Sequence, residues 1–250
     1  MTEEFISDFD EEEELSQLLN LITETAENYT KGGLQVLENA LERVQKYILE
    51  IEDEGEYQEI YVDIEFELAP ILNGTDFRAD CVTESAVTDP LFLDLIYTYI
   101  AVHNENVEVV LATNPHISED LMWKLAESTF EWEEDGTRLA LARNHSDQKL
   151  LAYLALEGNS NVRHQVALNP LTPPEVLENI AHDTAQCNFQ MEEYLFGEVT
   201  SYKGFARWCV ANNPSTDRST LQKILHHEFE PINPEAEKLL EEICRNRLNA

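Results

Sequence analysis

The chain has 250 residues, 43% of them hydrophobic, and 16 Lys and Arg stand against 50 Asp and Glu, for a formal net charge of −34. Such a charge repels nucleic acid and anionic lipid, which argues against direct binding to either and favours a basic protein or a cation as partner. Solubility is the alternative reason for the acidity. No run of about 18 apolar residues could cross a bilayer, and Met1 to Glu14 are acidic where a signal peptide would be basic and then apolar. We therefore expect a cytoplasmic protein.

The first 70 residues are the most acidic part of the chain, with 21 acidic and 3 basic side chains. Their acidic run repels itself too strongly to be ordered without a partner. It consists of Asp8, Asp10, Glu11, Glu12, Glu13 and Glu14. Apolar residues then recur at helical spacing over 12–28 and, after Lys31-Gly32-Gly33, over 34–51, so we expect two helices packed as a hairpin.

Residues 57–71 fit two patterns. Ile60, Val62, Ile64, Phe66 and Leu68 alternate with polar residues as in a half-buried strand, whereas Tyr57, Ile60, Tyr61, Ile64, Leu68 and Ile71 follow helical spacing. A lone strand would have no partner for its backbone groups, so we favour the helix. In either conformation Asp63, Glu65 and Glu67 add to an acidic surface.

From about residue 80 the chain repeats itself with a period of 25 to 30 residues. Each copy has an aliphatic residue, Ala, a variable position and Asn, usually followed by Pro. The copies are Leu111-Ala112-Thr113-Asn114-Pro115, Leu141-Ala142-Arg143-Asn144-His145, Val166-Ala167-Leu168-Asn169-Pro170 and Val210-Ala211-Asn212-Asn213-Pro214. An earlier, degenerate copy includes Thr88 to Ile96, and an aromatic-rich insertion at about 183–203 precedes the last copy.

Each part of the repeat has a physical interpretation. Asn and Pro end a first short helix, because the residue before Pro leaves the helical region and Asn bonds its own backbone in a turn. Thr172, Thr216 and Ser118 are then expected to cap a second helix, with Pro173 at its first position. The invariant Ala lets neighbouring helices approach. One helix pair cannot bury its own apolar face, so adjacent copies should stack into a solenoid.

The pattern from Val107 to about Leu225 resembles the leucine-rich repeat variant family. The resemblance implies a right-handed superhelix of alternating α and 3₁₀ helices, and helical repeats of the HEAT type are the alternative. The chain departs from the family in its irregular spacing and in His145 replacing Pro. Some relatives carry an iron–sulfur cluster on a cysteine-rich segment, which nothing here matches, so no cofactor is expected. The predicted fold is all-α, with an acidic helical cap over 1–79 and a solenoid over 80–250.

Motifs for catalysis or metal binding are missing from the sequence. Four dispersed cysteines (Cys81, Cys187, Cys209 and Cys244) are expected to be reduced and buried. His226 and His227 are adjacent on a helix and point in different directions, so no metal site is expected there. The asparagines of the repeat are expected to hold turns. We therefore expect a protein that is not an enzyme.

The expected function is protein–protein interaction through an acidic surface that binds and masks a basic protein, such as a nuclease or another nucleic-acid-binding protein. An immunity protein, an antitoxin and a DNA mimic are all of this type. The predicted binding residues are Asp10, Glu11, Glu12, Glu13, Glu14, Asp63, Glu65, Glu67, Tyr194 and Phe196. The alternative is a helical-repeat scaffold or regulatory adaptor in which charge is incidental and the insertion makes the contact.

Overall fold

A computed structural model describes the greater part of the chain, and it divides into two compact units, unit 1 (1–125) and unit 2 (126–250). The described residues are 15–22, 24, 34–50, 64, 68, 72, 75–76, 81–82, 87–101, 105–128, 135–183, 205–230 and 234–250. Each unit is described by itself. The division falls inside the predicted repeat region, and the proposed assignment of 1–79 as a cap and 80–250 as a solenoid stays a prediction.

The elements that the structure describes in unit 1 are helices and one short strand pairing. Residues 15–22 are helical, and the further elements are α2 (Leu34–Glu50), β1 (Thr75–Asp76), β2 (Cys81–Val82), α4 (Pro90–Tyr99), α5 (Glu105–Thr113) and α6 (Glu119–Glu127), whose last two residues belong to unit 2. β1 pairs with β2 in antiparallel register, Thr75 opposite Val82. α4 packs against both α2 and α5.

The two predicted amino-terminal helices are confirmed where the structure describes them. Their apolar stripes are buried, namely Leu15, Leu18, Leu19 and Ile22 in the first helix and Leu37, Ala40, Leu41 and Val44 in α2. Within 57–71 the structure describes Ile64 and Leu68, which have helical backbone and are fully buried. Residues four apart share one helix face, as the helical interpretation requires of these two positions, and the rest of the segment lies outside the described residues.

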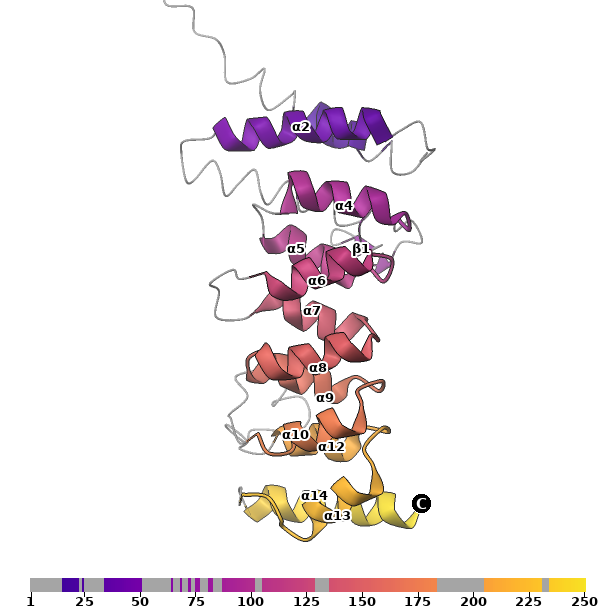
Figure 1. Ribbon diagram of the computed structural model, residues 1–250, viewed down its shortest axis with the longest axis vertical. Helices are drawn as coiled ribbons and strands as arrows, with labels where there is room; N and C mark the ends of the chain where they lie inside the picture. Colours follow the sequence, from indigo (N-terminus) through magenta and orange to yellow (C-terminus); the bar gives the residue numbers. More distant parts are fainter. Residues whose placement is uncertain are drawn as a thin grey trace, which may run out of the picture. The chain divides into compact units, whose positions relative to one another are not determined.

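Unit 2 consists of short helices that follow one another from α7 to α14 (Figure 1). They are α7 (Gly136–Asn144), α8 (Gln148–Glu157), α9 (Ser160–Leu168), α10 (Pro174–Ile180), α12 (Phe205–Asn212), α13 (Arg218–Leu225) and α14 (Pro234–Asn249). α7 packs against α9, and α9 packs against α12, so the first helices of successive repeats lie side by side. Ala142, Ala167 and Ala211 are fully buried in these three helices, as expected from their fixed place in the repeat.

Both helices of each described repeat in unit 2 are α-helices. The 3₁₀ helices that the family resemblance implied do not occur in 136–182 or 205–227. Two of these second helices, α8 and α13, begin at a residue whose side chain caps the helix. Asp147 accepts a hydrogen bond from the Leu150 amide at 2.8 Å and so caps α8, and Asp217 accepts one from the Thr220 amide at 2.7 Å and caps α13.

The expected capping role of Thr172 and Thr216 is wrong. Their hydroxyl groups donate backwards, to the carbonyls of Val166 and Val210 at the end of the preceding helix. Pro173 itself takes the cap position of α10, so the cap lies one residue later than expected and Pro174 is the first helical residue. A hydroxyl can bond to either helix, and here the carbonyl freed at the end of the first helix lies closer. Ser118 does cap α6, because its hydroxyl oxygen accepts from the Leu121 amide at 3.0 Å.

Candidate interaction site

All ten predicted binding residues lie outside the described part of the chain. They are Asp10, Glu11, Glu12, Glu13, Glu14, Asp63, Glu65, Glu67, Tyr194 and Phe196. Their neighbours Ile64 and Leu68 are described, and both are buried in helical backbone. The placement of the acidic run and of the aromatic pair therefore stays a prediction.

Negative charge is concentrated in unit 1. Residues 1–125 carry 30 acidic and 5 basic side chains, a net charge of −25, whereas residues 126–250 carry 20 acidic and 11 basic side chains, a net charge of −9. The two units therefore differ in the field that they present to a charged partner.

The asparagines of the repeat join one copy to the next. The Asn169 amide nitrogen donates to the carbonyls of Ala142 and His145 at 2.9 and 2.8 Å, while its side-chain oxygen accepts from the Leu171 amide at 3.0 Å. The two donated bonds are buried, so each satisfies a backbone carbonyl that water cannot reach. One side chain thus holds its own turn and fastens it to the preceding repeat.

The same bridge recurs at two other asparagines. Asn213 donates to the carbonyls of Ala167 and Asn169, both at 2.7 Å. In unit 1, Asn114 donates to the carbonyls of Val87 and Leu72. Val87 directly precedes the degenerate copy, so that copy takes the structural place of a repeat.

Asn144 does not belong to this series, although it aligns with it in sequence. Its amide is exposed and donates to the Ala140 carbonyl of its own helix at 2.8 Å. His145 is the next residue, and its backbone carbonyl accepts a hydrogen bond from the Asn169 side chain. The turn-holding interpretation of the asparagines is therefore correct for Asn114, Asn169 and Asn213 and wrong for Asn144.

A second recurring residue is an arginine six positions before the aligned asparagine, which the sequence analysis missed. Arg138 donates to the Ala126 carbonyl at 2.7 Å, and Arg207 donates to the Ala181 carbonyl at 2.8 Å. Arg163 donates to the Gly158 carbonyl at 2.7 Å. In each case the guanidinium bonds a carbonyl at the carboxyl end of the second helix of the preceding repeat. The helix dipole places partial negative charge there. Its fixed offset from the asparagine was a signal available in the sequence.

Each of these arginines also lies beside a carboxylate. Arg138 faces Asp135 at 3.4 Å, Arg163 faces Asp183 at 2.5 Å, and Arg207 faces Glu237 at 3.7 Å. The guanidinium group is therefore shared between a helix end and an acidic side chain. Three of the eleven basic residues of unit 2 are used inside the repeats in this way.

Arg207 is the most buried of the three, with 2% of its side chain exposed. Its guanidinium also donates to the Glu230 carbonyl at 2.6 Å and lies 5.3 Å from the centre of the Phe229 ring. Burial lowers the pKa of Arg207, while Glu237 and Glu230 act in the opposite direction. These contacts fix the segment after α13 against α12.

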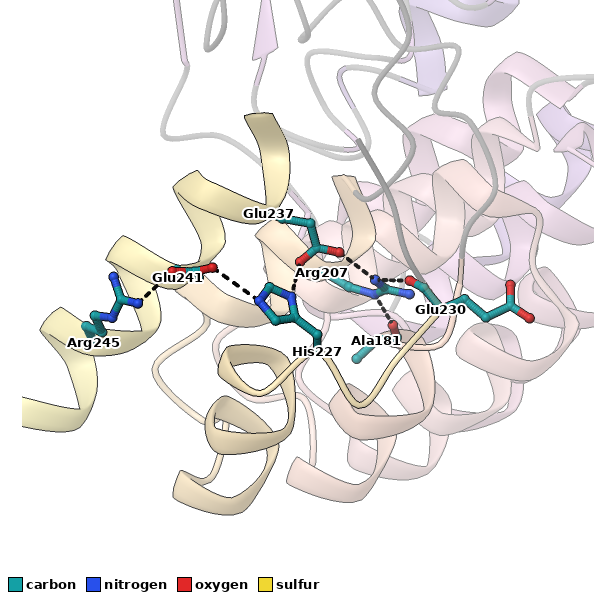
Figure 2. A network of polar contacts seen from close by, with 7 residues as sticks. All are labelled: Ala181, Arg207, His227, Glu230, Glu237, Glu241 and Arg245. Atoms are coloured by element: carbon teal, nitrogen blue, oxygen red, sulfur yellow. Dashed lines mark hydrogen bonds and ion pairs between the residues drawn. The ribbon is translucent and has the colours of Figure 1, made fainter. Parts of the chain in front are cut away.

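Figure 2 shows the polar network that continues from Arg207 along α14. The ring of His227 lies between two carboxylates of α14, with Nδ1 at 3.0 Å from Glu237 and Nε2 at 3.1 Å from Glu241. Arg245 then donates to Glu241 at 2.6 Å. His227 has a φ of 56°, a conformation that favours glycine, so its position directly after α13 is held by these contacts at some cost in backbone strain.

His164 is a second unusual histidine, with 2% exposure in the interior of unit 2. Its ring makes an edge contact with Phe205 at 5.1 Å, and neither ring nitrogen has a hydrogen-bond partner within the described residues. Desolvation lowers its pKa to about 4; Asp183 acts against this shift and Arg163 adds to it. His164 lies five residues before the aligned asparagine of its repeat, and Leu139 and Trp208 occupy this position in the neighbouring repeats. The position is therefore an apolar one that holds an imidazole in this repeat.

Neither of these clusters is arranged for metal binding. No group of three His, Cys, Asp or Glu side chains that could hold a metal ion occurs over the described ranges. Cys209 and Cys244 are free thiols and buried, as expected, and burial raises the pKa of Cys244 to about 11. No helix that the structure describes combines the length and the apolar character needed to cross a membrane.

Unit 1 has a hollow of about 380 Å³ between its first helix and α2, lined by Gln17, Leu18, Asn20, Leu21, Glu24 and Arg43. Its lining mixes apolar, amide and charged side chains of both signs.

Comparison of the sequence with models of protein families gives no match. Comparisons with curated proteins and with solved structures also give none.

Proposed function

We propose that this protein is a non-enzymatic interaction module, built as a right-handed helical solenoid, that binds and masks a basic protein through the acidic surface of unit 1. The observation that carries the proposal is the segregation of charge, with a net charge of −25 on residues 1–125 and −9 on residues 126–250. Solubility alone would be served by charge spread over the whole chain.

The repeats support the scaffold half of the proposal. Asn169 and Asn213 join adjacent repeats by hydrogen bonds to backbone carbonyls. A backbone carbonyl is present at every residue, whatever its side chain. Stacking therefore does not depend on the side chains that point to solvent. Helical repeats joined in this way present an extended lateral surface that is free to vary with the partner.

The use of basic residues supports the acidic half. Arg138, Arg163 and Arg207 are directed at helix ends within unit 2. Each of them also faces a carboxylate of unit 2, Asp135, Asp183 or Glu237, so these three positive charges are balanced within unit 2. The proposed partner is a nuclease or another nucleic-acid-binding protein, because such proteins present basic clefts where carboxylates can take the place of phosphates.

The alternative is a scaffold or adaptor whose contact is made by the insertion at 183–203, with Tyr194 and Phe196 as anchors. The aromatic content of that insertion favours this alternative. Ionic strength separates the two functions, since steering by charge weakens in salt and an aromatic contact does not.

The test compares three forms of the full chain against a partner captured at low ionic strength and then purified. They are the wild type, Asp63→Lys/Glu65→Lys/Glu67→Lys and Tyr194→Ser/Phe196→Ser, and the measurement is the association rate constant across a salt series. We expect the wild-type rate to fall steeply with salt, the triple variant to associate slowly with a flat salt dependence, and the aromatic variant to keep the wild-type slope. A rate insensitive to salt, lost only in the aromatic variant, would establish the adaptor instead.

A further inference from the structure

The ring of His164 on α9 lies against the amino-terminal end of α12. It makes an edge contact with Phe205, the first residue of that helix, with 5.1 Å between the ring centres and 86° between the ring planes. Phe205 in turn stacks on Trp208, with 5.7 Å between the ring centres. These three rings make an aromatic contact between α9 and the first turn of α12.

The residue before His164 makes a second contact beside this ring. Arg163 donates to Asp183, which follows α10, at 2.5 Å. Residues 184–204 lie outside the described residues, and Asp183 and Phe205 border them. Two consecutive residues of α9 therefore contact both of the chain segments that border this stretch.

The neutral form of His164 fits its surroundings, and the charged form does not. The side chain is 2% exposed, and neither ring nitrogen has a hydrogen-bond partner within the described residues. Protonation gives the ring a second N–H donor and a full charge, both of which are costly where water cannot reach them. Burial accordingly lowers the pKa of His164 to about 4.

Two neighbouring charges act on the ring in opposite directions. Asp183 favours the charged form of His164, and Arg163 disfavours it. Arg207 of α12 and Arg138 of α7 are directed at backbone carbonyls elsewhere. The other charged side chains of the helices packed against α9 are exposed or paired: Arg143, Lys149, Glu157, Glu175 and, bonded to Lys223, Glu178. Asp183 is itself paired with Arg163, so it gives a protonated ring little compensation.

The other end of α12 is joined to α9 by bonds that carry no charge. Asn213, which directly follows α12, donates to the carbonyls of Ala167 and Asn169 at 2.7 Å, and both bonds are buried. Amide and carbonyl groups do not titrate in the range where histidine does. α12 is therefore attached to α9 by a bridge that is insensitive to pH at its carboxyl end and by a titratable ring at its amino end.

We propose that the contact between His164 and Phe205 is an acid-sensitive junction: protonation of His164 separates the first turn of α12 from α9, while the Asn213 bridge holds the other end of α12 in place. Opening lets water reach the ring, which can then bind a proton without the cost of burial. The junction is closed above about pH 6.5 and opens as the pH falls toward 4, because over this range the open form binds a proton that the closed form does not. It belongs to unit 2 alone, so its opening can be measured whatever partner unit 1 binds.

Hydrogen exchange of the full chain, read by mass spectrometry in α12 and α13 at pH 7 and pH 5, tests this junction. Each measured rate is divided by the rate of an unstructured peptide at the same pH, which gives a protection factor. For the wild type we expect the protection of α12 to fall about twentyfold, the ratio that proton binding gives for pKa values of about 4 in the closed form and 6.5 in the open form. The protection of α13 should change far less.

His164→Leu is the decisive variant, because leucine cannot be protonated and Leu139 occupies the equivalent position in the preceding repeat. We expect equal protection of α12 at the two pH values in this variant. His226→Gln is the matched control, since His226 is exposed at the end of α13, and it should keep the wild-type response. A wild-type response in His164→Leu would overturn the role of His164, and equal losses in α12 and α13 of the wild type would show that acid unfolds unit 2 as a whole.

Asp183→Asn keeps the ring and serves as the second variant, which also covers the case that His164→Leu does not fold. It removes the carboxylate that favours the charged ring and leaves Arg163, which disfavours it. Opening of α12 should therefore require a lower pH than in the wild type. Opening at the same pH or at a higher pH would contradict the proposal.

Discussion

A primary amide has two donor hydrogens and one acceptor oxygen, and Asn169 uses all three of these bonding groups. The two hydrogens bond the carbonyls of Ala142 and His145, and the oxygen holds the turn at Leu171. No other side chain of this size combines these functions, because aspartate lacks the donors and serine is too short. The residue type at this position follows from the two carbonyls left open by the preceding repeat.

Asn169→Ala should lower the free energy of unfolding by about 1–3 kcal/mol, because it leaves buried backbone groups without partners. Urea unfolding followed by circular dichroism measures the change. Asn144→Ala is the control, since Asn144 is exposed and its side chain donates within its own helix, and we expect a change within about 0.5 kcal/mol. Equal losses in the two variants would show that the bridge between repeats is not what stabilises the chain.

His164 makes stability depend on pH with a definite sign. Its folded pKa of about 4 lies below the ordinary value of 6.5, so between these pH values the unfolded chain binds a proton that the folded chain does not. The stability contributed by its neutral form is therefore present above pH 6.5 and is lost as the pH falls toward 4, by about 3 kcal/mol at most.

His164→Leu should remove this dependence and leave stability at neutral pH unchanged or higher. The leucine matches Leu139 at the equivalent position and removes two ring nitrogens that have no described partner. Denaturant unfolding of wild type and variant at neutral pH and near pH 4.5 isolates the effect, because all other titrating groups are common to both. The idea fails if both proteins lose the same free energy on acidification, or if the variant is markedly less stable at neutral pH.

At the scale of the elements, the first helices of neighbouring repeats come close because alanine stands where they meet. Ala167 of α9 and Ala211 of α12 are fully buried, and α9 packs directly on α12. A larger side chain at either place would push the two helices apart. The cost would then extend to the asparagine bridges, which require the present spacing between repeats.

Ala211→Leu should therefore reduce the free energy of unfolding by about 1–3 kcal/mol through overpacking. Ala152→Leu on α8, where the side chain is half-buried, is the matched control, with an expected change of less than about 1 kcal/mol. Thermal unfolding and urea unfolding both report the difference. Similar stability for the two variants would mean that Ala211 does not lie at a tight helix contact.

At the scale of the whole molecule, the two units should respond differently to salt. Unit 1 has a net charge of −25, and self-repulsion of that size destabilises a compact chain, whereas unit 2 at −9 repels itself far less. Added sodium chloride screens this repulsion. Salt should therefore stabilise unit 1 more than unit 2.

Calorimetry over a sodium chloride series should show two unfolding transitions, of which the less stable one moves upward in temperature with salt while the other changes little. Assignment of the transitions comes from hydrogen exchange in α4 and α9, one helix from each unit. One transition with a single salt response would contradict the independence of the units and the segregation of charge as a source of instability.

Several features were predictable from local sequence alone. Amphipathic spacing correctly placed the first helix, α2 and the helical backbone at Ile64, because periodicity depends only on neighbouring residues. The turns at Asn114, Asn169 and Asn213 were also expected, since an asparagine before proline bonds its own backbone. The predicted binding residues lie outside the described residues, so their assignment rests on the sequence alone.

Tertiary structure decided the partners of the same residues. Asn144 and Asn169 hold the same place in the repeat, although His145 follows the one and Pro170 the other, and of the two Asn169 reaches the carbonyls of a preceding repeat. The Thr172 hydroxyl could bond the helix before it or the helix after it. It donates to the Val166 carbonyl of the preceding helix, because that carbonyl lies within reach. The sequence by itself therefore determined where helices and turns occur, while packing determined which hydrogen bonds join them, because a donor selects among acceptors only when neighbouring repeats have brought those acceptors within reach.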